Sequence, residues 1–168
     1  VPSLRVVFVD TGYHFAETYR HAEALTARLR LNVHVVSPRM SAARQEALYG
    51  KLWEGDEDEL RRYLDMNKVE PMHRALSQLR ATARMSGVRA EQTEARRALP
   101  RVDRSASQAK LHPLLRWSQA DVGACMAAHG LPYHPLVAEG YRSIGDVHST
   151  IPTFEGQHAR AGRLLGAR

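Results

Sequence analysis

Four cations in the 168-residue sequence stand where a turn or a helix could bring them to an anion. Lys68 precedes the expected start of a helix, and Arg89 follows Gly87 at the end of a candidate strand. Arg160 and Arg163 are three residues apart, so one face of a helix would carry both. Ammonium and planar guanidinium groups neutralise phosphate and sulfate. Taken singly each is more commonly a surface charge, but together they predict a ligand with several negative charges.

A second candidate site is the turn formed by Asp10, Thr11 and Gly12, which follows the apolar run of residues 6–9. An apolar run without polar alternation is typical of a strand that is covered on both faces of a parallel sheet. In such sheets small molecules bind beyond the carboxyl ends of the strands, so the three turn residues are expected to meet a ligand. A buried strand followed by an ordinary glycine turn explains the same residues equally well.

Strands and helices are expected to alternate around these residues. A helical period over residues 15–29 lies between strands at residues 6–9 and 32–36, which predicts a β-α-β unit and a parallel α/β sheet. Further elements are predicted as helices at 41–49, within 50–65, from 71 and at 118–130, and strands at 82–86 and 111–115. A break in the helical pattern is expected at 67–71, and a long binding or lid loop at 133–153.

The composition narrows the class of protein. Hydrophobic residues make up 43% and charged residues 25%, as in a globular protein with a core. The sequence has no apolar run of membrane-spanning length and no signal-peptide pattern at its first residues, so we expect a cytoplasmic protein. The one cysteine, Cys125, excludes an internal disulfide and a multi-cysteine metal site made by this chain alone, and its apolar helical face predicts a buried structural thiol. The histidine spacing does not predict a metal site.

The net charge of +6 predicts an anionic partner without identifying it. A nucleotide, a nucleic acid or a merely solvated arginine-rich surface would each fit that charge. Neither of the standard glycine-rich phosphate loops occurs in the sequence. Aromatic residues make up 7% and are not interleaved with basic residues, so no stacking platform for single strands is predicted.

Five segments, in chain order, resemble the phosphoadenosine phosphosulfate reductases of sulfate assimilation. They are DTGYHFAETYR from Asp10, SAARQEALYGKLWE from Ser41, NKVEPM from Asn67, GVRAEQ from Gly87, and YHPL with EGYRSIGDVHST ending at Thr150. The resemblance covers essentially the whole chain. It implies a Rossmann-like three-layer α/β sandwich of the adenine-nucleotide α-hydrolase type, with a reductase domain at residues 1–153 and the start of a C-terminal tail at 154–168.

The resemblance also implies a reaction. An enzyme cysteine would attack the sulfur of 3′-phosphoadenylyl sulfate (PAPS), and thioredoxin or glutaredoxin would then release sulfite. The substrate-binding residues implied by motif position are Asp10, Thr11 and Gly12 on the adenosine, Lys68 and Arg89 at the phosphosulfate, and Arg160 and Arg163 closing on it from the tail. Gly87 is implied to bind the substrate as well. PAPS and thioredoxin are the implied partners, a homodimer is left open, and neither DNA nor a membrane is expected.

Two motifs of the family do not occur in this sequence. The reactive cysteine lies in a Glu-Cys-Gly-Leu-His motif, which is expected just after Arg168, and the Ser-rich phosphate loop is expected ahead of Val1. We therefore expect this chain to be a segment of a longer protein. The first strand, the phosphate loop and the nucleophile are expected to be missing from the segment. The chain by itself is then expected to be inactive.

The substrate is inferred from a second comparison within the family. Relatives that reduce adenosine phosphosulfate hold a four-iron cluster on four cysteines, where this sequence has Tyr63, Leu64, Asp146 and Ser149. Without thiolate ligands no iron–sulfur cluster or other bound cofactor is expected, which favours the 3′-phosphorylated substrate. An adenosine phosphosulfate reductase, a non-catalytic adenine-nucleotide- or RNA-binding homologue, and an adenylating or pyrophosphate-releasing enzyme of the same fold remain alternatives.

Overall fold

The computed structural model describes residues 3–104 and 108–154. The chain divides into two compact units, one made of Val1–Leu76 with Tyr133–Arg168 and the other of Ser77–Pro132. The predicted reductase domain of residues 1–153 therefore includes residues of both units. Its boundary at residue 153 remains a prediction.

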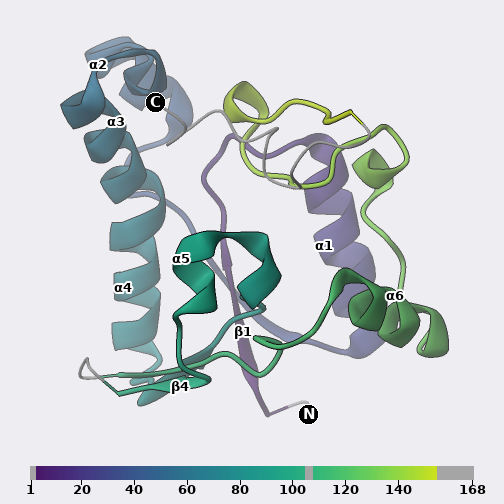
Figure 1. Ribbon diagram of the computed structural model, residues 1–168. Helices are drawn as coiled ribbons and strands as arrows, with labels where there is room; N and C mark the ends of the chain where they lie inside the picture. The colour runs from purple at the N-terminus through teal and green to yellow at the C-terminus, as the bar shows by residue number, and fades with distance from the viewer. Residues whose placement is uncertain (1–2, 105–107, 155–168) are drawn as a thin grey trace. The chain divides into compact units, whose positions relative to one another are not determined.

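A parallel β-α-β unit opens the first unit, as predicted (Figure 1). β1 (Arg5–Val9) pairs in parallel with β2 (Asn32–Val36), and α1 (Ala16–Leu29) connects the two strands. Residues 6–9 of β1 are only partly buried, so the complete coverage expected from their apolar run is not reached. Among the described residues, β2 is the one strand that pairs with β1.

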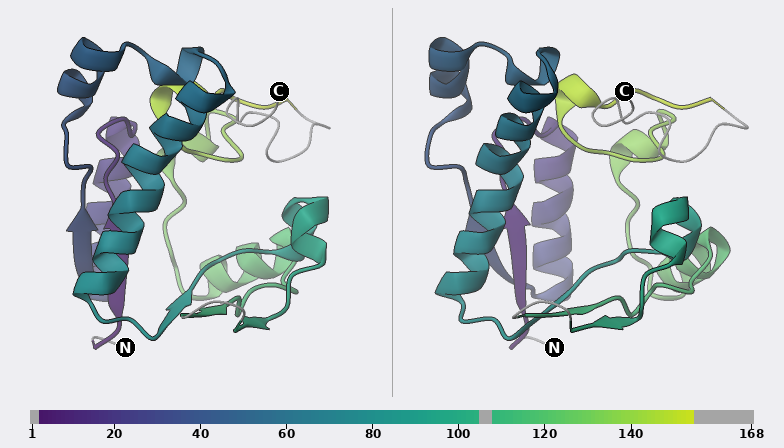
Figure 2. Two further views of the ribbon diagram at one scale, coloured as in Figure 1. Left: turned by 90° about the vertical axis from the view of Figure 1, so that its left-hand side faces the viewer. Right: turned by 60° about the vertical axis from the view of Figure 1, so that its left-hand side comes forward.

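The helices that follow correct one prediction. They are α2 (Ala42–Tyr49), the 3-10 turn η1 (Leu52–Glu54), α3 (Glu57–Leu64), the π-helical segment η2 (Asp65–Val69) and α4 (Glu70–Gln78). The last three are contiguous and form one unbroken helical ribbon (Figure 2). The break expected at residues 67–71 is wrong. Pro71 lacks an N–H and its ring would clash with the preceding turn of an α-helix, and the wider π turn ahead of it provides room for the ring.

Local capping explains where these helices begin. The Ser41 side chain accepts a hydrogen bond from the Arg44 amide, and Gly50 ends α2 with a positive φ of 69°, both at the predicted positions. Asp56 and Glu59 form a capping box at the start of α3. These side chains satisfy amide groups that have no partner inside the helix.

The core of the first unit is formed where the β-α-β unit, the helical ribbon of residues 57–78 and the loop of residues 133–154 pack together. Its buried apolar residues are Val36, Leu52, Tyr63, Ala75, Leu76 and Leu136. Residues 133–154 have only the short turns η4 (Pro135–Val137) and η5 (Val147–Ser149), in agreement with the predicted long loop. The loop is fastened to the turn after β1, because the Val147 amide donates to the Tyr13 carbonyl over 2.8 Å.

The second unit has a small mixed sheet. β3 (Ala83–Met85) pairs in parallel with β5 (Ala109–Leu111), and β4 (Val102–Asp103) pairs antiparallel with β5. The strand expected at residues 111–115 is therefore wrong beyond Leu111, since Pro113 cannot continue a ladder and the chain turns there.

The helices of the second unit complete it. η3 (Ala90–Gln92) and α5 (Glu94–Arg97) are short, and α6 (Gln119–Ala128) begins at the predicted Ser118–Asp121 capping box. Cys125 on α6 is a free thiol that is partly exposed, so the expectation of a buried thiol is wrong.

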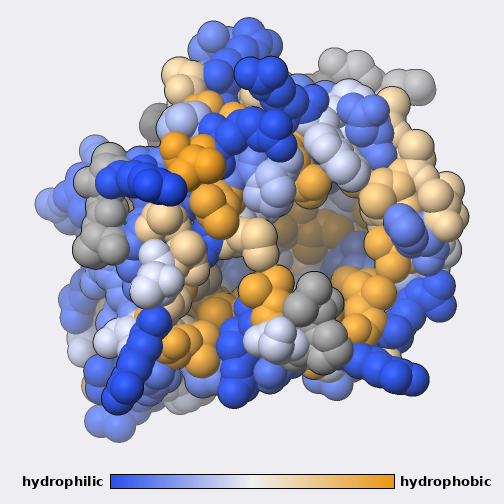
Figure 3. Space-filling model, turned by 90° about the horizontal axis from the view of Figure 1, so that it is seen from below, coloured by the Kyte–Doolittle hydropathy of each residue, from blue (hydrophilic) through white to orange (hydrophobic). Residues whose placement is uncertain are grey.

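Among the described helices of the whole chain, none is long and apolar enough to cross a membrane. The face shown in Figure 3 mixes hydrophilic and apolar side chains.

Candidate functional site

The site of the first unit is built around the carboxylate of Asp146, which is 0% exposed. One oxygen, Oδ1, accepts a hydrogen bond from Thr11 Oγ1 over 2.7 Å, and the other, Oδ2, accepts one from Tyr63 Oη over 2.8 Å. The Lys68 ammonium lies 2.5 Å from Oδ2. His14 Nδ1 faces Oδ1 at 3.7 Å. A buried carboxylate needs such partners, because burial alone would disfavour its charged form.

The ionisation of Asp146 follows from these contacts. Burial alone would raise its pKa, but the hydrogen bond and charge of Lys68, together with the hydroxyl donors of Thr11 and Tyr63, hold the pKa of Asp146 below its ordinary value. Asp146 is therefore an anion at neutral pH, paired with the Lys68 cation.

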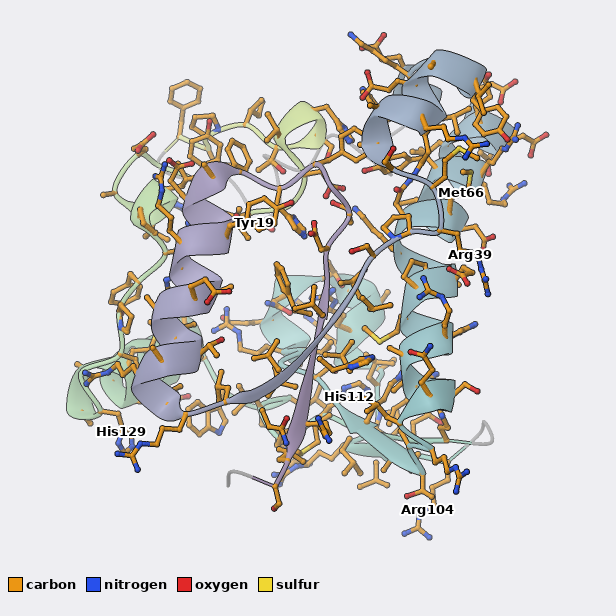
Figure 4. The ribbon with its side chains drawn as sticks, turned by 180° about the vertical axis from the view of Figure 1, so that it is seen from behind. Tyr19, Arg39, Met66, Arg104, His112 and His129 are labelled. Carbon is orange, nitrogen blue, oxygen red and sulfur yellow. The ribbon has the colours of Figure 1, made fainter. Side chains whose placement is uncertain are left out.

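The turn after β1 carries the predicted residues Asp10, Thr11 and Gly12. Asp10 Oδ1 accepts hydrogen bonds from the Gly12 amide over 2.9 Å and from Tyr19 Oη over 2.7 Å, and α1 supplies Tyr19 (Figure 4). Burial, followed by the hydrogen bond to Asp10, raises the pKa of Tyr19 to about 12. Gly12 is exposed with a φ of 77°, and a Cβ added there would lie 3.3 Å from the Ala42 side chain.

The Thr11 side chain is directed away from solvent. It is buried, donates to Asp146 and accepts from the Tyr13 amide over 3.2 Å. The Asp10 amide donates to the Val36 carbonyl over 2.9 Å, which ties this turn to the carboxyl end of β2. The turn and the Asp146 network therefore share the carboxyl edge of the β1–β2 pair, where ligands of parallel sheets bind.

Lys68 reaches the network from the π-helical segment η2. The neighbouring Asn67, which is 0% exposed, forms a reciprocal amide pair with Gln45 of α2, with both N···O distances at 2.9 Å. Asn67 Nδ2 also donates to the Tyr63 carbonyl over 3.0 Å. The Asn67 side chain therefore bonds both to α2 and to the helical turn before it. This pairing fixes the helix turn that presents Lys68.

An aromatic cluster surrounds the network on the same unit. Trp53 and His148 stack at 3.9 Å between ring centroids, and Tyr13 and Tyr63 contact both rings edge-on or tilted. His148 Nε2 lies 2.9 Å from Tyr63 Oη. Since Tyr63 gives its proton to Asp146, His148 is assigned as the donor through Nε2. Burial lowers the pKa of His148, which favours the neutral ring with its proton on Nε2.

The second unit holds Gly87 and Arg89. Gly87 is exposed just after β3, whereas the Arg89 side chain is 11% exposed. One guanidinium nitrogen of Arg89 lies 3.2 Å from Glu91, and the other donates to Gln119 over 2.8 Å. These contacts hold the guanidinium in place within its own unit.

The predicted site residues thus fall into three groups. Asp10, Thr11, Gly12 and Lys68 share the first unit, where Asp146 connects Thr11 to Lys68; Gly87 and Arg89 belong to the second unit. Arg160 and Arg163 lie outside the described residues. Substrate contacts of all eight residues remain predictions.

Sequence reasoning missed the central role of Asp146. It considered the residue only as a position where relatives bind a cluster, although Asp146 lies within EGYRSIGDVHST, one of the segments that carry the resemblance. Among residues 3–104 and 108–154 there is no cluster of three or more His, Cys, Asp or Glu residues that could hold a metal ion.

Comparisons with known proteins extend these observations. Residues 1–152 match the family described as "Phosphoadenosine phosphosulfate reductase domain". A phosphoadenosine 5′-phosphosulfate reductase of Alkalilimnicola ehrlichii is 46% identical over 167 residues, which are 99% of this chain and 68% of that protein. A reductase of the same name from a Synechococcus species is 47% identical over 90% of this chain and 66% of its own length. The chain therefore spans about two thirds of the length of these relatives.

Solved structures show the same kinship. The crystal structure of phosphoadenylyl-sulfate reductase from Candida auris, a phosphate complex, matches with a TM-score of 0.74 and 33% identity over 88% of this chain and 71% of that one. An FMN adenylyltransferase of Candida glabrata matches with a TM-score of 0.62 and 19% identity, over 90% of this chain and 47% of that one, which shows a shared fold. The predicted fold class, a Rossmann-like α/β sandwich of the adenine-nucleotide α-hydrolase type, is confirmed. The chain belongs to the phosphoadenosine phosphosulfate reductase family.

Proposed function

We propose that the protein containing this chain reduces PAPS to sulfite and adenosine 3′,5′-bisphosphate. The observation that carries the proposal is the family match over residues 1–152, joined by relatives that bear the reductase name. The ionised network at the carboxyl edge of the β1–β2 pair supports it, because this edge is where a nucleotide would be met.

The proposed reaction has two steps. A cysteine thiolate, in the tail motif expected after Arg168, attacks the sulfonyl sulfur and forms an S–S bond. The S–O bond to the phosphate breaks, and adenosine 3′,5′-bisphosphate leaves with the electron pair. One thiolate of thioredoxin then attacks the enzyme sulfur, so that sulfite leaves and a mixed disulfide forms; the second thiol of thioredoxin attacks that disulfide, which releases the enzyme thiolate and leaves thioredoxin as the disulfide. Two electrons from the dithiol thereby reduce the sulfonate sulfur to sulfite.

The residues of this chain would prepare the first step. A thiolate approaches a centre that is surrounded by anionic oxygens, so those charges must be neutralised beforehand. Lys68 has three donors on its ammonium and gives one of them to Asp146, which leaves donors for an oxyanion. We assign Lys68, Arg89, Arg160 and Arg163 to the phosphosulfate.

The remaining assignments concern the nucleoside, a cofactor and the partner. The turn at Asp10 to Gly12 would contact the adenosine, with Gly87 lining the same substrate. We propose a cluster-free enzyme, because Tyr63 and Asp146 bond to each other and Ser149 Oγ donates to the Asp146 carbonyl over 3.3 Å. Tyr63, Asp146 and Ser149 thus supply oxygen groups, and Leu64 an apolar side chain, at the four positions where relatives are expected to supply thiolates. Thioredoxin as reductant and a cytoplasmic location complete the proposal.

The test is sulfite release by the full-length protein with thioredoxin and either PAPS or adenosine phosphosulfate. We expect sulfite from PAPS at a kcat/KM at least about 100-fold above that for adenosine phosphosulfate, because the site would bind the additional phosphate charge. A preference for the unphosphorylated nucleotide would overturn the substrate assignment. Release of no sulfite from either nucleotide would overturn the enzyme assignment.

A further inference from the structure

Asp146 has more partners than a buried carboxylate requires for neutrality. Lys68 alone balances its charge, yet Thr11 and Tyr63 also donate to it, one to each oxygen. Its side chain is 1% exposed, whereas that of Lys68 is 31% exposed. The carboxylate is therefore the fixed member of the ion pair, and the ammonium is the member that a solute can reach.

The segment that carries Asp146 is fixed as well. Asp146 forms an antiparallel bridge with His14, and the adjacent Val147 amide donates to the Tyr13 carbonyl over 2.8 Å. The Gly145 amide donates to Thr150 Oγ1 over 3.2 Å, which closes the loop on itself. Asp146 is thus attached to the turn after β1 by backbone bonds as well as by its side chain.

Lys68 would have several rotamers without this anchor. Its stem is a flexible four-carbon chain, and ordering such a side chain costs conformational free energy. The ion pair holds the ammonium beside Thr11, at the carboxyl edge of the β1–β2 pair. The ammonium is consequently held beside this edge before any ligand arrives.

We propose that Asp146 is a positioning residue that fixes the Lys68 ammonium for an anionic group of the substrate. Asp146 itself does not touch the substrate and acts through Lys68. The kinetic consequence rests on the proposed function, whereas the positioning itself does not.

The first experiment measures positioning without turnover. The full-length protein is acetylated at lysines with an N-hydroxysuccinimide ester, and peptide mass spectrometry gives the rate at Lys68 relative to Lys51, whose side chain is 56% exposed. Asp146→Asn preserves the shape of the side chain and removes its charge. We expect the relative rate at Lys68 to rise at least about 10-fold, the scale of one charge-assisted hydrogen bond. An unchanged rate would overturn the proposal.

Two further variants keep this experiment decisive. Glu70→Gln is the matched control, since Glu70 follows the same π segment and pairs with Arg39 and Arg74 at 3.0 Å without contacting Lys68. It should leave the Lys68 rate unchanged. If Asp146→Asn fails to fold, Tyr63→Phe removes the donor that shares Oδ2 with Lys68, which strengthens the ion pair, and we expect the rate at Lys68 to fall about threefold. Equal rates in Tyr63→Phe and the wild type would then overturn the proposal.

The second experiment is a double-mutant cycle on PAPS reduction. Asp146→Asn should lower kcat/KM at least about 10-fold in the wild type and by less than about twofold in the Lys68→Ala background. Purely structural damage would instead multiply the two losses, and such additivity would overturn the proposal. If the wild type releases no sulfite, the proposed function fails, and the labelling rates still decide whether Asp146 positions Lys68.

Discussion

The reciprocal amide pair of Asn67 and Gln45 allows a quantitative test of how the π-helical segment is held. Asn67→Ala removes three hydrogen bonds, two to Gln45 and one to the Tyr63 carbonyl. Gln45 is 2% exposed and retains the bond from Nε2 to the Met40 carbonyl, but its Oε1 loses the Asn67 donor. A buried acceptor left unsatisfied costs about 1–3 kcal/mol, and each of the two further hydrogen bonds contributes about 1 kcal/mol. We expect a loss of about 3–5 kcal/mol in the free energy of unfolding.

The assay is urea unfolding followed by tryptophan fluorescence, to which Trp53, stacked on His148 in the same unit, contributes. Gln45→Ala and the double variant complete a cycle. Because each single variant leaves one buried amide without its partner, the double variant should be more stable than the sum of losses by about 1–2 kcal/mol.

Asp58→Ala is the matched control on the adjacent helix. Its ion pair with Arg61 is exposed on both sides, so its loss should cost less than about 1 kcal/mol. A loss in Asn67→Ala no larger than in this control would refute the reasoning, because the amide pair would then contribute no more than a surface contact.

Two further predictions concern catalysis and acid stability. Lys68→Ala and Arg89→Ala should each weaken capture of PAPS by about 1–3 kcal/mol, measured as kcat/KM of the full-length protein, and unchanged kinetics in both would contradict the assignment. Burial and the neighbouring His21 lower the pKa of His134 below 6.5, and its Nδ1 accepts from the Leu136 amide. Its contribution to stability is therefore complete above pH 6.5 and lost as the pH falls through the folded-state pKa. His134→Gln should lose less stability than the wild type between about pH 7.5 and about pH 5, as measured by urea unfolding, and equal losses would argue against this role.

The sequence predicted the elements whose signals are local. The apolar run before Asp10 and the period after it determine a β-α-β unit, and Ser41, Gly50 and Ser118 mark helix ends through their own side chains or backbone freedom. Each of these signals depends on neighbours within a few residues, which is why it can be recognised without a structure.

The parts that sequence reasoning missed depend on distant partners. The helix continues through residues 65–71 because Asn67 finds Gln45, which is 22 residues earlier, and no local pattern reports that pairing. The proline at position 71 predicted a break at residues 67–71, and the π turn avoids that break. Asp146 was similarly undervalued, since its partners lie as far as 135 residues away in the sequence.

The same long-range contacts connect folding to the assembly of the site. Three segments that are far apart in the sequence supply the members of this network. Thr11 belongs to the turn after β1, Lys68 to the π-helical segment and Asp146 to the returning loop, so the network forms when these segments pack together. A state in which the loop around Asp146 has left the turn loses the hydrogen bonds from Thr11 and Tyr63 and the ion pair with the partly exposed Lys68, in addition to its apolar contacts. The arrangement that places Lys68 at the sheet edge is thus also a condition for the stability of the unit, which explains why a charged group can be held there before substrate binds.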